Sequence, residues 1–273
     1  MSVISELVTT QAIATEESLL LREDQEGVAT LTLNRPKQYN ALSEAMLTAL
    51  QTELDRIGAD SSIRVVVIAA KGKAFCAGHD LKEMRATPDQ AYYTALFKQC
   101  SRMMLTITSL PQPVIAKVQG LATAAGCQLV AACDLAVAAD TARFATSGIN
   151  VGLFCATPAV AVSRNLSGKQ ALELLLTGEF IDAQAALRQG LINRVVPAEE
   201  LDAAVQRLVE AIVAKSSVAV SLGKQMFYKQ LEMGLEAAYQ YASEVMACNM
   251  MAEDASEGID AFMQKRPAVW RGR

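Results

Sequence analysis

Two short segments of small residues could perform chemistry with their backbone groups. Ala77-Gly78-His79 follows an apolar, strand-like run, and Ala124-Ala125-Gly126 opens an apolar helical stretch. Backbone N–H groups stabilise negative charge that develops on a carbonyl oxygen, and each donor is worth roughly 3–4 kcal/mol by analogy with measured cases. A helix N-terminus favours such a donor. The segments together predict an oxyanion-binding site, although a close helix–strand contact explains either one alone equally well.

Composition and charge narrow the classes of partner. The chain has 273 residues, of which 52% are hydrophobic and 20% charged, and these values predict one large domain with a substantial core. The net charge is −4 and no long basic run occurs, so we expect no nucleic-acid partner. The apolar stretch 121–139 contains Gln128 and Asp134, and we interpret it as a buried helix running into a strand, with no membrane span.

The cysteines and the N-terminus bear on metal binding and location. Six cysteines and one histidine occur without a CxxC pair, so we expect no metal site. Cysteines in apolar surroundings are typical of free thiols in a reducing compartment. Residues 1–26 show neither a signal peptide nor an Arg-rich transit peptide. We therefore expect a cytoplasmic protein.

The elements that position these segments alternate between strands and helices. Apolar runs predict strands at 28–33, 64–70, 114–118, 135–138 and 192–195. Helical spacing and caps predict helices at 43–57, 92–107 and after Gly120, and then at 157–166, 169–176, 182–189, 198–214, 217–231, 234–251 and 255–264. This order predicts an α/β core with a helical C-terminal part. Periodicity alone does not choose between a doubly wound sheet and a spiral of strand-strand-helix turns.

A series of motifs resembles the crotonase (enoyl-CoA hydratase/isomerase) superfamily over nearly the whole chain. These motifs are Asn34-Arg35-Pro36-Lys37 with Asn40-Ala41-Leu42, Phe75-Cys76-Ala77-Gly78 with Asp80-Leu81, Gly120 to Leu129, Cys133-Asp134-Leu135-Ala136, Thr177-Gly178-Glu179, Gly190-Leu191-Ile192, Val195-Val196-Pro197 and Glu257-Gly258-Ile259. The resemblance implies the spiral fold, in which residues 1–200 bind acyl-CoA. It also implies C-terminal helices, residues 201–273, that assemble a homotrimer or a dimer of trimers.

The resemblance also implies roles for individual residues. The backbone N–H groups of His79 and Ala125 would form the oxyanion hole, while the imidazole of His79 points away from the carbonyl. Asp80 and Asp134 would be structural hydrogen-bond acceptors. The other implied contacts are with coenzyme A, which enters only as part of the thioester substrate and not as a tightly bound cofactor. Ala77, His79 and Leu81 would lie beside the adenine. Lys37, Lys73 and Lys82 would lie near the phosphates, and Lys265 near the coenzyme of a neighbouring subunit.

The chain departs from the hydratase pattern at two positions. Two glutamates handle the water in the hydratases, and by motif position they correspond to Gln128 and Gly148. Glutamine cannot exchange a proton at neutral pH, and glycine is expected to leave open space there. We therefore expect hydration to be weak or absent. The polar groups left nearby are Asn150, Thr123, Thr146, Ser147 and Cys155.

Two functions remain open at this point. One is an enzyme, nominally an enoyl-CoA hydratase/isomerase, that acts through an oxyanion-stabilised enolate or tetrahedral intermediate. The other is a protein that binds or sequesters acyl-CoA without turnover. The segment 144–158 resembles the mitochondrial "enoyl-CoA hydratase domain-containing" subgroup, which shares the altered positions and has no well-defined common activity.

Overall fold

The strands of the protein form two sheets. The structure, a computed structural model, describes residues 18–273. The larger sheet has six strands in the order β1-β2-β3-β5-β7-β10, with the bounds β1 Leu20–Gln25, β2 Val28–Leu33, β3 Val65–Ala70, β5 Val114–Val118, β7 Leu135–Ala139 and β10 Arg194–Val196. The smaller sheet has the order β4-β6-β8-β9, with β4 Ala74–Cys76, β6 Leu121–Thr123, β8 Arg143–Ala145 and β9 Ile181–Asp182.

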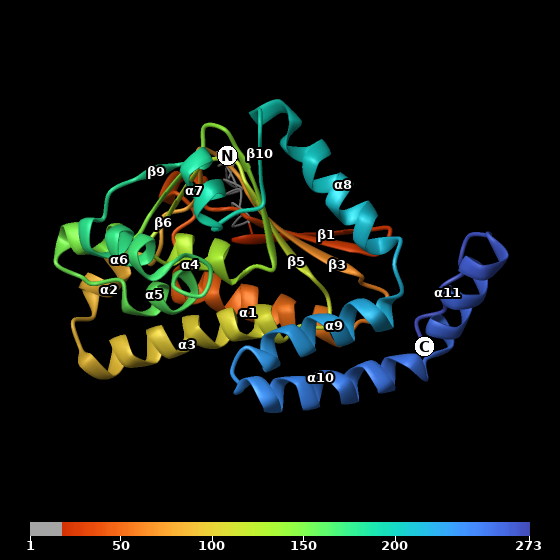
Figure 1. The fold of residues 1–273 in the computed structure, drawn as a ribbon. Coiled ribbons are helices and arrows are strands. Elements are labelled where there is room, and N and C mark those ends of the chain that lie inside the picture. Colours follow the sequence, from red (N-terminus) through yellow and green to blue (C-terminus); the bar gives the residue numbers. More distant parts are fainter. Residues whose placement is uncertain (1–17) are drawn as a thin grey trace, which may run out of the picture.

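Helices surround these sheets and then continue into the C-terminal part of the chain (Figure 1). Their bounds are α1 Glu44–Gly58, α2 Leu81–Ala86, α3 Gln90–Ser109, α4 Ala125–Ala132, α5 Ala156–Val162, α6 Gly168–Thr177, α7 Ala183–Gln189, α8 Leu201–Val213, α9 Ser217–Gln230, α10 Leu235–Met250 and α11 Glu253–Gln264. Short 3-10 turns are η1 Pro36–Gln38, η2 Ser147–Val151 and η3 Ala198–Glu200.

The central strands of the larger sheet are buried on both faces. Every ladder in it is parallel except the one between β1 and β2. Val66 and Ile68 of β3 belong to the core that includes α1, α3 and α4, whereas Val65 and Val67 face α8. A parallel strand covered on both faces is expected to be apolar throughout, and this explains the run Val-Val-Val-Ile in β3.

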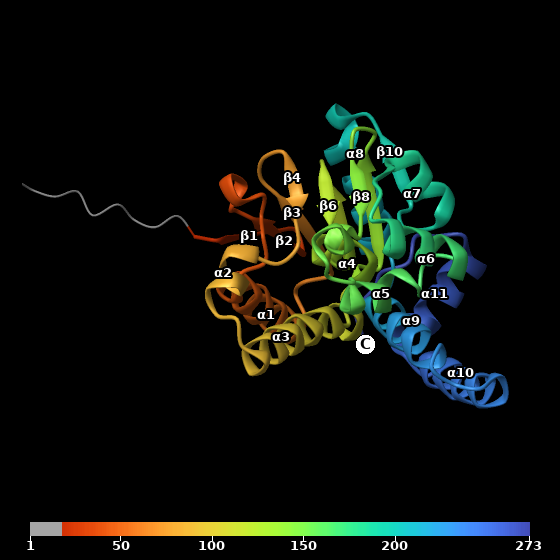
Figure 2. The same cartoon turned by 90° about the vertical axis from the view of Figure 1, so that its left-hand side faces the viewer.

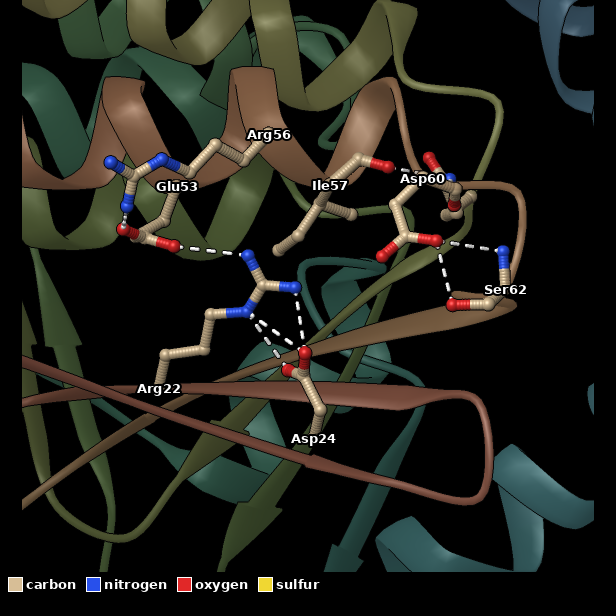
Figure 3. Close-up of polar contacts among 8 residues, drawn as sticks. Arg22, Asp24, Glu53, Arg56, Ile57, Asp60 and Ser62 are labelled. Carbon is tan, nitrogen blue, oxygen red and sulfur yellow. Dashed lines mark hydrogen bonds and ion pairs between the residues drawn. The ribbon is translucent and has the colours of Figure 1, made fainter.

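The first strand is joined to the first helix by a polar network near the surface (Figure 3). Arg22 of β1 pairs with Asp24 at 2.7 Å and with Glu53 of α1 at 3.0 Å. Beyond α1, Asp60 accepts hydrogen bonds from the backbone and hydroxyl of Ser62. Because these groups are partly exposed, we expect each contact to add little to stability.

A buried polar cluster fastens α9 to the core. Lys224 of α9 lies 2.7 Å from the carboxylate of Asp134, and the two side chains are 6% and 14% exposed. Lys224 also donates to the carbonyls of Ile107 and Gln112, and Tyr228 donates to Asp134 at 2.9 Å. Burial raises the pKa of the Asp134 carboxyl and lowers that of the Lys224 ammonium. The cluster holds the C-terminal helices to the sheet.

Most of the predicted elements are confirmed. The helix capped by Ser43 begins at Glu44, and the helix between Asp182 and Gly190 has those residues as its caps. The strand prediction missed β1 and every strand of the smaller sheet. The segment after Gly120 was predicted to be helical from its start, but β6 comes first and the helix begins at Ala125. The division of the chain near residue 200 stays a prediction.

Candidate functional site

Three strands of the smaller sheet bring the predicted site segments together. β4, β6 and β8 run parallel and side by side, so their carboxyl ends share one edge (Figure 2). The segment 77–79 follows β4, the segment 124–128 follows β6, and the segment 146–155 follows β8. Ligands in open α/β sheets bind outside the carboxyl ends of strands, so this edge is the candidate site.

The turn after β4 has a fixed orientation. Gly78 has a φ of 92°, a conformation that favours glycine. The backbone of Ala77 donates to Tyr39 at 3.0 Å, and the Gly78 carbonyl accepts from Leu42 at 2.8 Å. Among residues 18–273, no hydrogen-bond acceptor is paired with the backbone N–H of His79. The turn therefore presents the N–H of His79 as an available donor, on a backbone that the hydrogen bonds of Ala77 and Gly78 hold in place.

The turn after β6 is strained. Ala124 has a φ of 51°, which is rare for a residue with a Cβ, and it immediately precedes α4. Its own N–H donates to Ala145 at 3.0 Å, whereas the N–H of Ala125, the first residue of the helix, has no acceptor in the described part of the chain. The sequence carries no signal for the positive φ of Ala124, because alanine has no preference for that conformation.

Two glycines allow these turns to touch. A Cβ added to Gly78 would lie 2.9 Å from the Cβ of Ala124 and 3.2 Å from the nitrogen of Ala125. A Cβ added to Gly126 would overlap the carbonyl of Cys76. The unpaired N–H groups of His79 and Ala125 thus belong to two backbone segments in direct contact.

The imidazole of His79 is packed as an apolar group. It meets the ring of Phe97 edge-on, with 5.4 Å between the ring centroids. Both ring nitrogens are buried and have no hydrogen-bond partner of good geometry among residues 18–273. Burial lowers the pKa of the imidazole, and the backbone of Leu42 opposes this more weakly. The ring is therefore neutral at physiological pH.

Gln128 lies one helical turn beyond Ala125. Gln128 is 3% exposed, and its side-chain Oε1 has no hydrogen-bond partner within the described residues. Helical side chains lean toward the N-terminus of their helix, so we expect this amide to lie over the turn that carries Ala125. A buried amide oxygen without a partner is costly, and it is a reason to look for a ligand here.

Gly148 does not border open space, contrary to the prediction. A Cβ at this position would lie 2.6 Å from the carbonyl oxygen of Leu153 and 2.8 Å from the sulfur of Cys155. The chain returns over Gly148 because the N–H of Leu153 donates to the Gly148 carbonyl at 2.9 Å. A carboxylate cannot be added at this position without moving the segment 153–155.

The remaining polar groups at this edge are neutral. Thr123 and Ser147 share a hydroxyl–hydroxyl hydrogen bond of 2.6 Å. Burial raises the pKa of the Cys155 thiol, with an opposing effect from the backbone of Gly148. Thr146 and Asn150 are engaged with the carbonyls of Leu174 and Gly178. Segments 120–132 and 144–163 contain no Asp, Glu, Lys or Arg.

The three lysines predicted to lie near the phosphates are exposed, Lys37 in η1, Lys73 at the amino end of β4 and Lys82 in α2. Lys73 follows Gly72, whose added Cβ would lie 2.7 Å from the Cβ of Pro36, so Lys73 and Lys37 occupy adjoining loops. Lys82 is exposed in the first turn of α2, after Leu81, which is 54% exposed. Lys265 ends α11, which lies on the far side of the molecule from α2 (Figure 1).

The two aspartates make the structural hydrogen bonds that were predicted. Asp80 accepts from the backbone of Lys82 and Glu83 at the start of α2, and it pairs with Arg35 at 3.1 Å. Asp134 accepts from the backbone of Val114 at 2.6 Å. Neither carboxylate is free to exchange protons with a ligand.

Other parts of the described chain have weaker features of a ligand-binding site. Two surface hollows lie on α3, around Thr94, and between β1, β2 and α8, and neither is lined by a predicted site residue. Within residues 18–273 no group of three or more His, Cys, Asp or Glu side chains could hold a metal ion. None of the helices in that same range has the length and apolarity to cross a bilayer.

Comparison with known proteins places the chain among relatives of one kind. The family described as enoyl-CoA hydratase/isomerase matches residues 23–273. The "Enoyl-CoA hydratase domain-containing protein 3, mitochondrial" of Rattus norvegicus is 48% identical over 255 residues, which are 93% of this chain and 85% of that protein. The 2,3-dehydroadipyl-CoA hydratase of Escherichia coli is 35% identical over 94% of this chain and all of its own length.

Solved structures agree with this assignment. An enoyl-CoA hydratase from Mycobacterium smegmatis superposes with a TM-score of 0.92 at 58% identity, over 93% of this chain and 99% of its own. The human enoyl-CoA hydratase domain-containing protein 3 superposes with a TM-score of 0.90 at 47% identity, over 93% of this chain and 100% of its own. The predicted crotonase-type α/β fold is confirmed.

The predicted cytoplasmic location is contradicted. The relatives named enoyl-CoA hydratase domain-containing protein 3 from rat, mouse, Xenopus laevis and human are all named mitochondrial. Free thiols indicate a reducing compartment, and the mitochondrial matrix is reducing as well, so the cysteines could not separate the two. Most of the N-terminal segment used in that prediction, residues 1–17, lies outside the described residues.

Proposed function

Because the chain belongs to the enoyl-CoA hydratase/isomerase family, we propose that it binds an acyl-CoA thioester and stabilises negative charge on the thioester oxygen. The donors are the backbone N–H groups of His79 and Ala125. One observation carries this proposal: both N–H groups lack an acceptor among residues 18–273, and they lie on turns in contact through Gly78 and Gly126. Two donors fixed in advance cost no reorganisation when charge develops.

The proposed reaction is an acyl-CoA conversion in which charge stabilisation supplies most of the catalysis. General acid and base groups contribute about 10²–10⁴ in rate, and neither Gln128 nor Gly148 can supply one. We therefore expect weak hydration. Double-bond isomerisation or decarboxylation through an enolate demands less of a base. The hydratase name of the Escherichia coli relative supports the acyl-CoA class of substrate.

The coenzyme portion of the thioester would bind along the exposed loops beside the site. Lys37, Lys73 and Lys82 would meet the phosphates, where ammonium groups act as point-charge donors. Ala77 and Leu81 would lie beside the adenine. Asn40 supports this arrangement because its amide donates to the carbonyls of Lys71 and Ala74, each at 2.8 Å, and so fixes one loop on the other.

We further propose that residues 201–273 form an assembly region that builds a homotrimer or a dimer of trimers. Large apolar side chains on and between its helices are exposed, among them Leu235 at 76%, Met251 at 86% and Phe262 at 84%. Such a surface is typical of an interface. Assembly would bring Lys265 to the coenzyme of a neighbouring subunit, since it is remote from the site of its own subunit.

A second candidate function is acyl-CoA binding without turnover. The crowding around Gly148 favours this function. The space that a catalytic carboxylate would need at this position is filled by the Leu153 carbonyl and the Cys155 thiol. Such a protein would sequester or sense thioesters.

Incubation with crotonyl-CoA in heavy water, followed by mass spectrometry, separates the two functions. Deuterium uptake or addition of water supports an enzyme with an oxyanion hole, and free coenzyme A indicates thioester hydrolysis. Unchanged crotonyl-CoA, with binding shown on the same sample, supports the binder.

The donors themselves can be tested with a thioester labelled with ¹³C at the carbonyl. Polarisation by two N–H groups lowers the infrared frequency of the bound carbonyl. Ala125→Pro removes one donor at the first position of a helix, where proline is tolerated. Gly168→Pro is the matched control, because Gly168 opens α6 with nothing near its Cβ position. A carbonyl frequency that does not move on binding to the wild-type protein would contradict the proposed role of His79 and Ala125.

A further inference from the structure

Residues 266–273 run back along α11, and we call them the C-terminal strap. Glu257 of α11 accepts two hydrogen bonds from the guanidinium group of Arg266, at 2.6 and 2.8 Å. One helical turn earlier, Glu253 pairs with Arg273 at 3.0 Å. The start of the strap thus meets the later turn of the helix and its end meets the earlier turn, so the strap lies antiparallel to α11.

Asp254 anchors the strap to the rest of the molecule. This residue is 2% exposed. Its carboxylate accepts from the backbone N–H groups of Arg271 at 2.7 Å and Gly272 at 3.1 Å, and from the hydroxyl of Ser216 at 2.6 Å. Because Ser216 caps α9, one buried carboxylate joins α11, the strap and the start of α9 (Figure 1).

Trp270 fixes the strap at a second point. Its indole N–H donates to the carbonyl of Ala214, between α8 and α9, at 2.8 Å. A Cβ added to Gly258 would lie 3.0 Å from the indole ring, so the ring packs on the backbone of α11. Within α11 only Asp254 and Ala261 are buried. The position of this helix therefore depends on its contacts with the strap.

The strap begins next to Lys265, which in the proposed function meets the coenzyme of a neighbouring subunit. Lys265 ends α11 with a φ of 56°, a left-handed conformation that favours glycine. The N–H of Arg266 donates to the carbonyl of Ala261 at 3.0 Å and closes this helix end. A lysine at a position where glycine would cost less is a reason to look for a function of its side chain.

We propose that the C-terminal strap positions Lys265 for the coenzyme of a neighbouring subunit, with Asp254 as the positioning residue. Asp254 does not touch the coenzyme. It holds the strap, and through the strap α11, against the start of α9. A backbone ordered before binding loses little freedom when Lys265 meets the nucleotide. This inference rests on the proposed acyl-CoA function and deepens it.

Two thioesters separate positioning from a structural role. Crotonyl-CoA carries the nucleotide, whereas crotonyl-pantetheine lacks it. In calorimetric titrations of the full chain, Asp254→Asn should weaken crotonyl-CoA binding about 2- to 5-fold, the size of one exposed ion pair, and leave crotonyl-pantetheine binding unchanged. Asp260→Asn is the matched control, because Asp260 is an exposed carboxylate on the same helix.

Trp270 reports the strap directly, since the chain has one tryptophan. Release of the strap should shift its fluorescence emission to longer wavelength in Asp254→Asn, while circular dichroism shows an intact fold. Gly272→Ala disturbs the strap without changing α11, because Gly272 has a φ of 72° and its added Cβ would lie 2.8 Å from the hydroxyl of Ser217. It should reproduce both effects, and it decides the outcome if Asp254→Asn does not fold.

Lys265→Gly tests the link between the strap and the coenzyme. Glycine suits the left-handed conformation, so the variant should be at least as stable as the wild type. It should nevertheless bind crotonyl-CoA about 2- to 5-fold more weakly. Adding Asp254→Asn should cause no further loss, because both changes act through the same side chain.

Three results would overturn the inference and leave the acyl-CoA function intact. They are a crotonyl-CoA affinity that Asp254→Asn and Gly272→Ala leave unchanged, equal losses for both thioesters, and additive losses when Lys265→Gly and Asp254→Asn are combined. If the wild-type chain binds neither thioester, the proposed function itself fails.

Discussion

The carbonyl group of Cys76 lies directly against Gly126, so the backbone of β4 meets the first turn of α4 where a side chain is missing. This contact, together with that of Gly78 on Ala124, fixes the distance between the two turns that carry the unpaired N–H groups. The geometry of the candidate site therefore depends on two positions that lack a Cβ, more than on any polar side chain.

Gly126→Ala should separate the two turns. A methyl group there overlaps the backbone of Cys76, which cannot rotate away, so we expect a loss of about 1–3 kcal/mol in the free energy of unfolding. Urea denaturation measures this loss. Gly168→Ala is the control, because nothing lies within 4 Å of its Cβ position. Equal stability of the two variants would show that β4 and α4 are not in this contact.

Gly148→Ala should destabilise the protein for a similar reason. Its methyl group would meet the Leu153 carbonyl and the Cys155 sulfur, and we expect a loss of about 1–3 kcal/mol by thermal or urea unfolding. Adding Cys155→Ala should recover only part of the loss, because the Leu153 carbonyl remains. A neutral Gly148→Ala variant would mean that the segment 153–155 moves aside at little cost. In that case, Gln128→Glu with Gly148→Glu becomes a fair test of restored hydration.

His79 should make stability depend on pH in a defined window. Its pKa is lowered by burial, so the unfolded chain binds a proton at higher pH than the folded one. The contribution of His79 to the free energy of unfolding is fully present above its unfolded pKa of about 6.5. That contribution is lost as the pH falls through the lower pKa of His79 in the folded chain. Urea titrations from pH 7.5 to 5 should show a decline that His79→Phe reduces. The interpretation is direct because the chain has one histidine. An identical pH dependence in the variant would show that the ring is solvated.

Lys224→Met should weaken the attachment of α9. It leaves the buried Asp134 carboxylate without its cation, and breaking such a pair costs about 3–5 kcal/mol. Tyr228→Phe removes one hydrogen bond to the same carboxylate and should cost about 1–2 kcal/mol. Lys117→Met is the matched control, since its ion pair with Asp202 lies at the surface and is worth about 1 kcal/mol or less. Similar losses for both lysines would indicate that the Asp134 cluster is solvated.

The sequence predicted well those elements that are long enough to show a period. α1, with its cap Ser43, and the continuously apolar β3 are examples. The strands β4, β6 and β8 have three residues each, too few for alternation to appear, and they were missed. Short strands of this kind gain their definition from neighbours in the sheet, which no local pattern reveals.

The candidate site was likewise predicted only in part. The resemblance to the crotonase superfamily implies that His79, Ala125 and Gln128 share one site. The positive φ of Ala124 and the crowding around Gly148 were not predicted, because both follow from contacts between segments far apart in the sequence. The bond between Thr123 and Ser147 depends on the register of β6 and β8 and was equally invisible.

The smaller sheet shares the hydrophobic core of the larger one. Phe75 of β4 and Phe144 of β8 are fully buried, and they belong to the same cluster as Val66 and Ile68 of β3. The turns that carry the unpaired N–H groups therefore begin directly on the core. A deep mutational scan should accordingly find that substitutions at Phe75 and Phe144 impair folding and ligand response together.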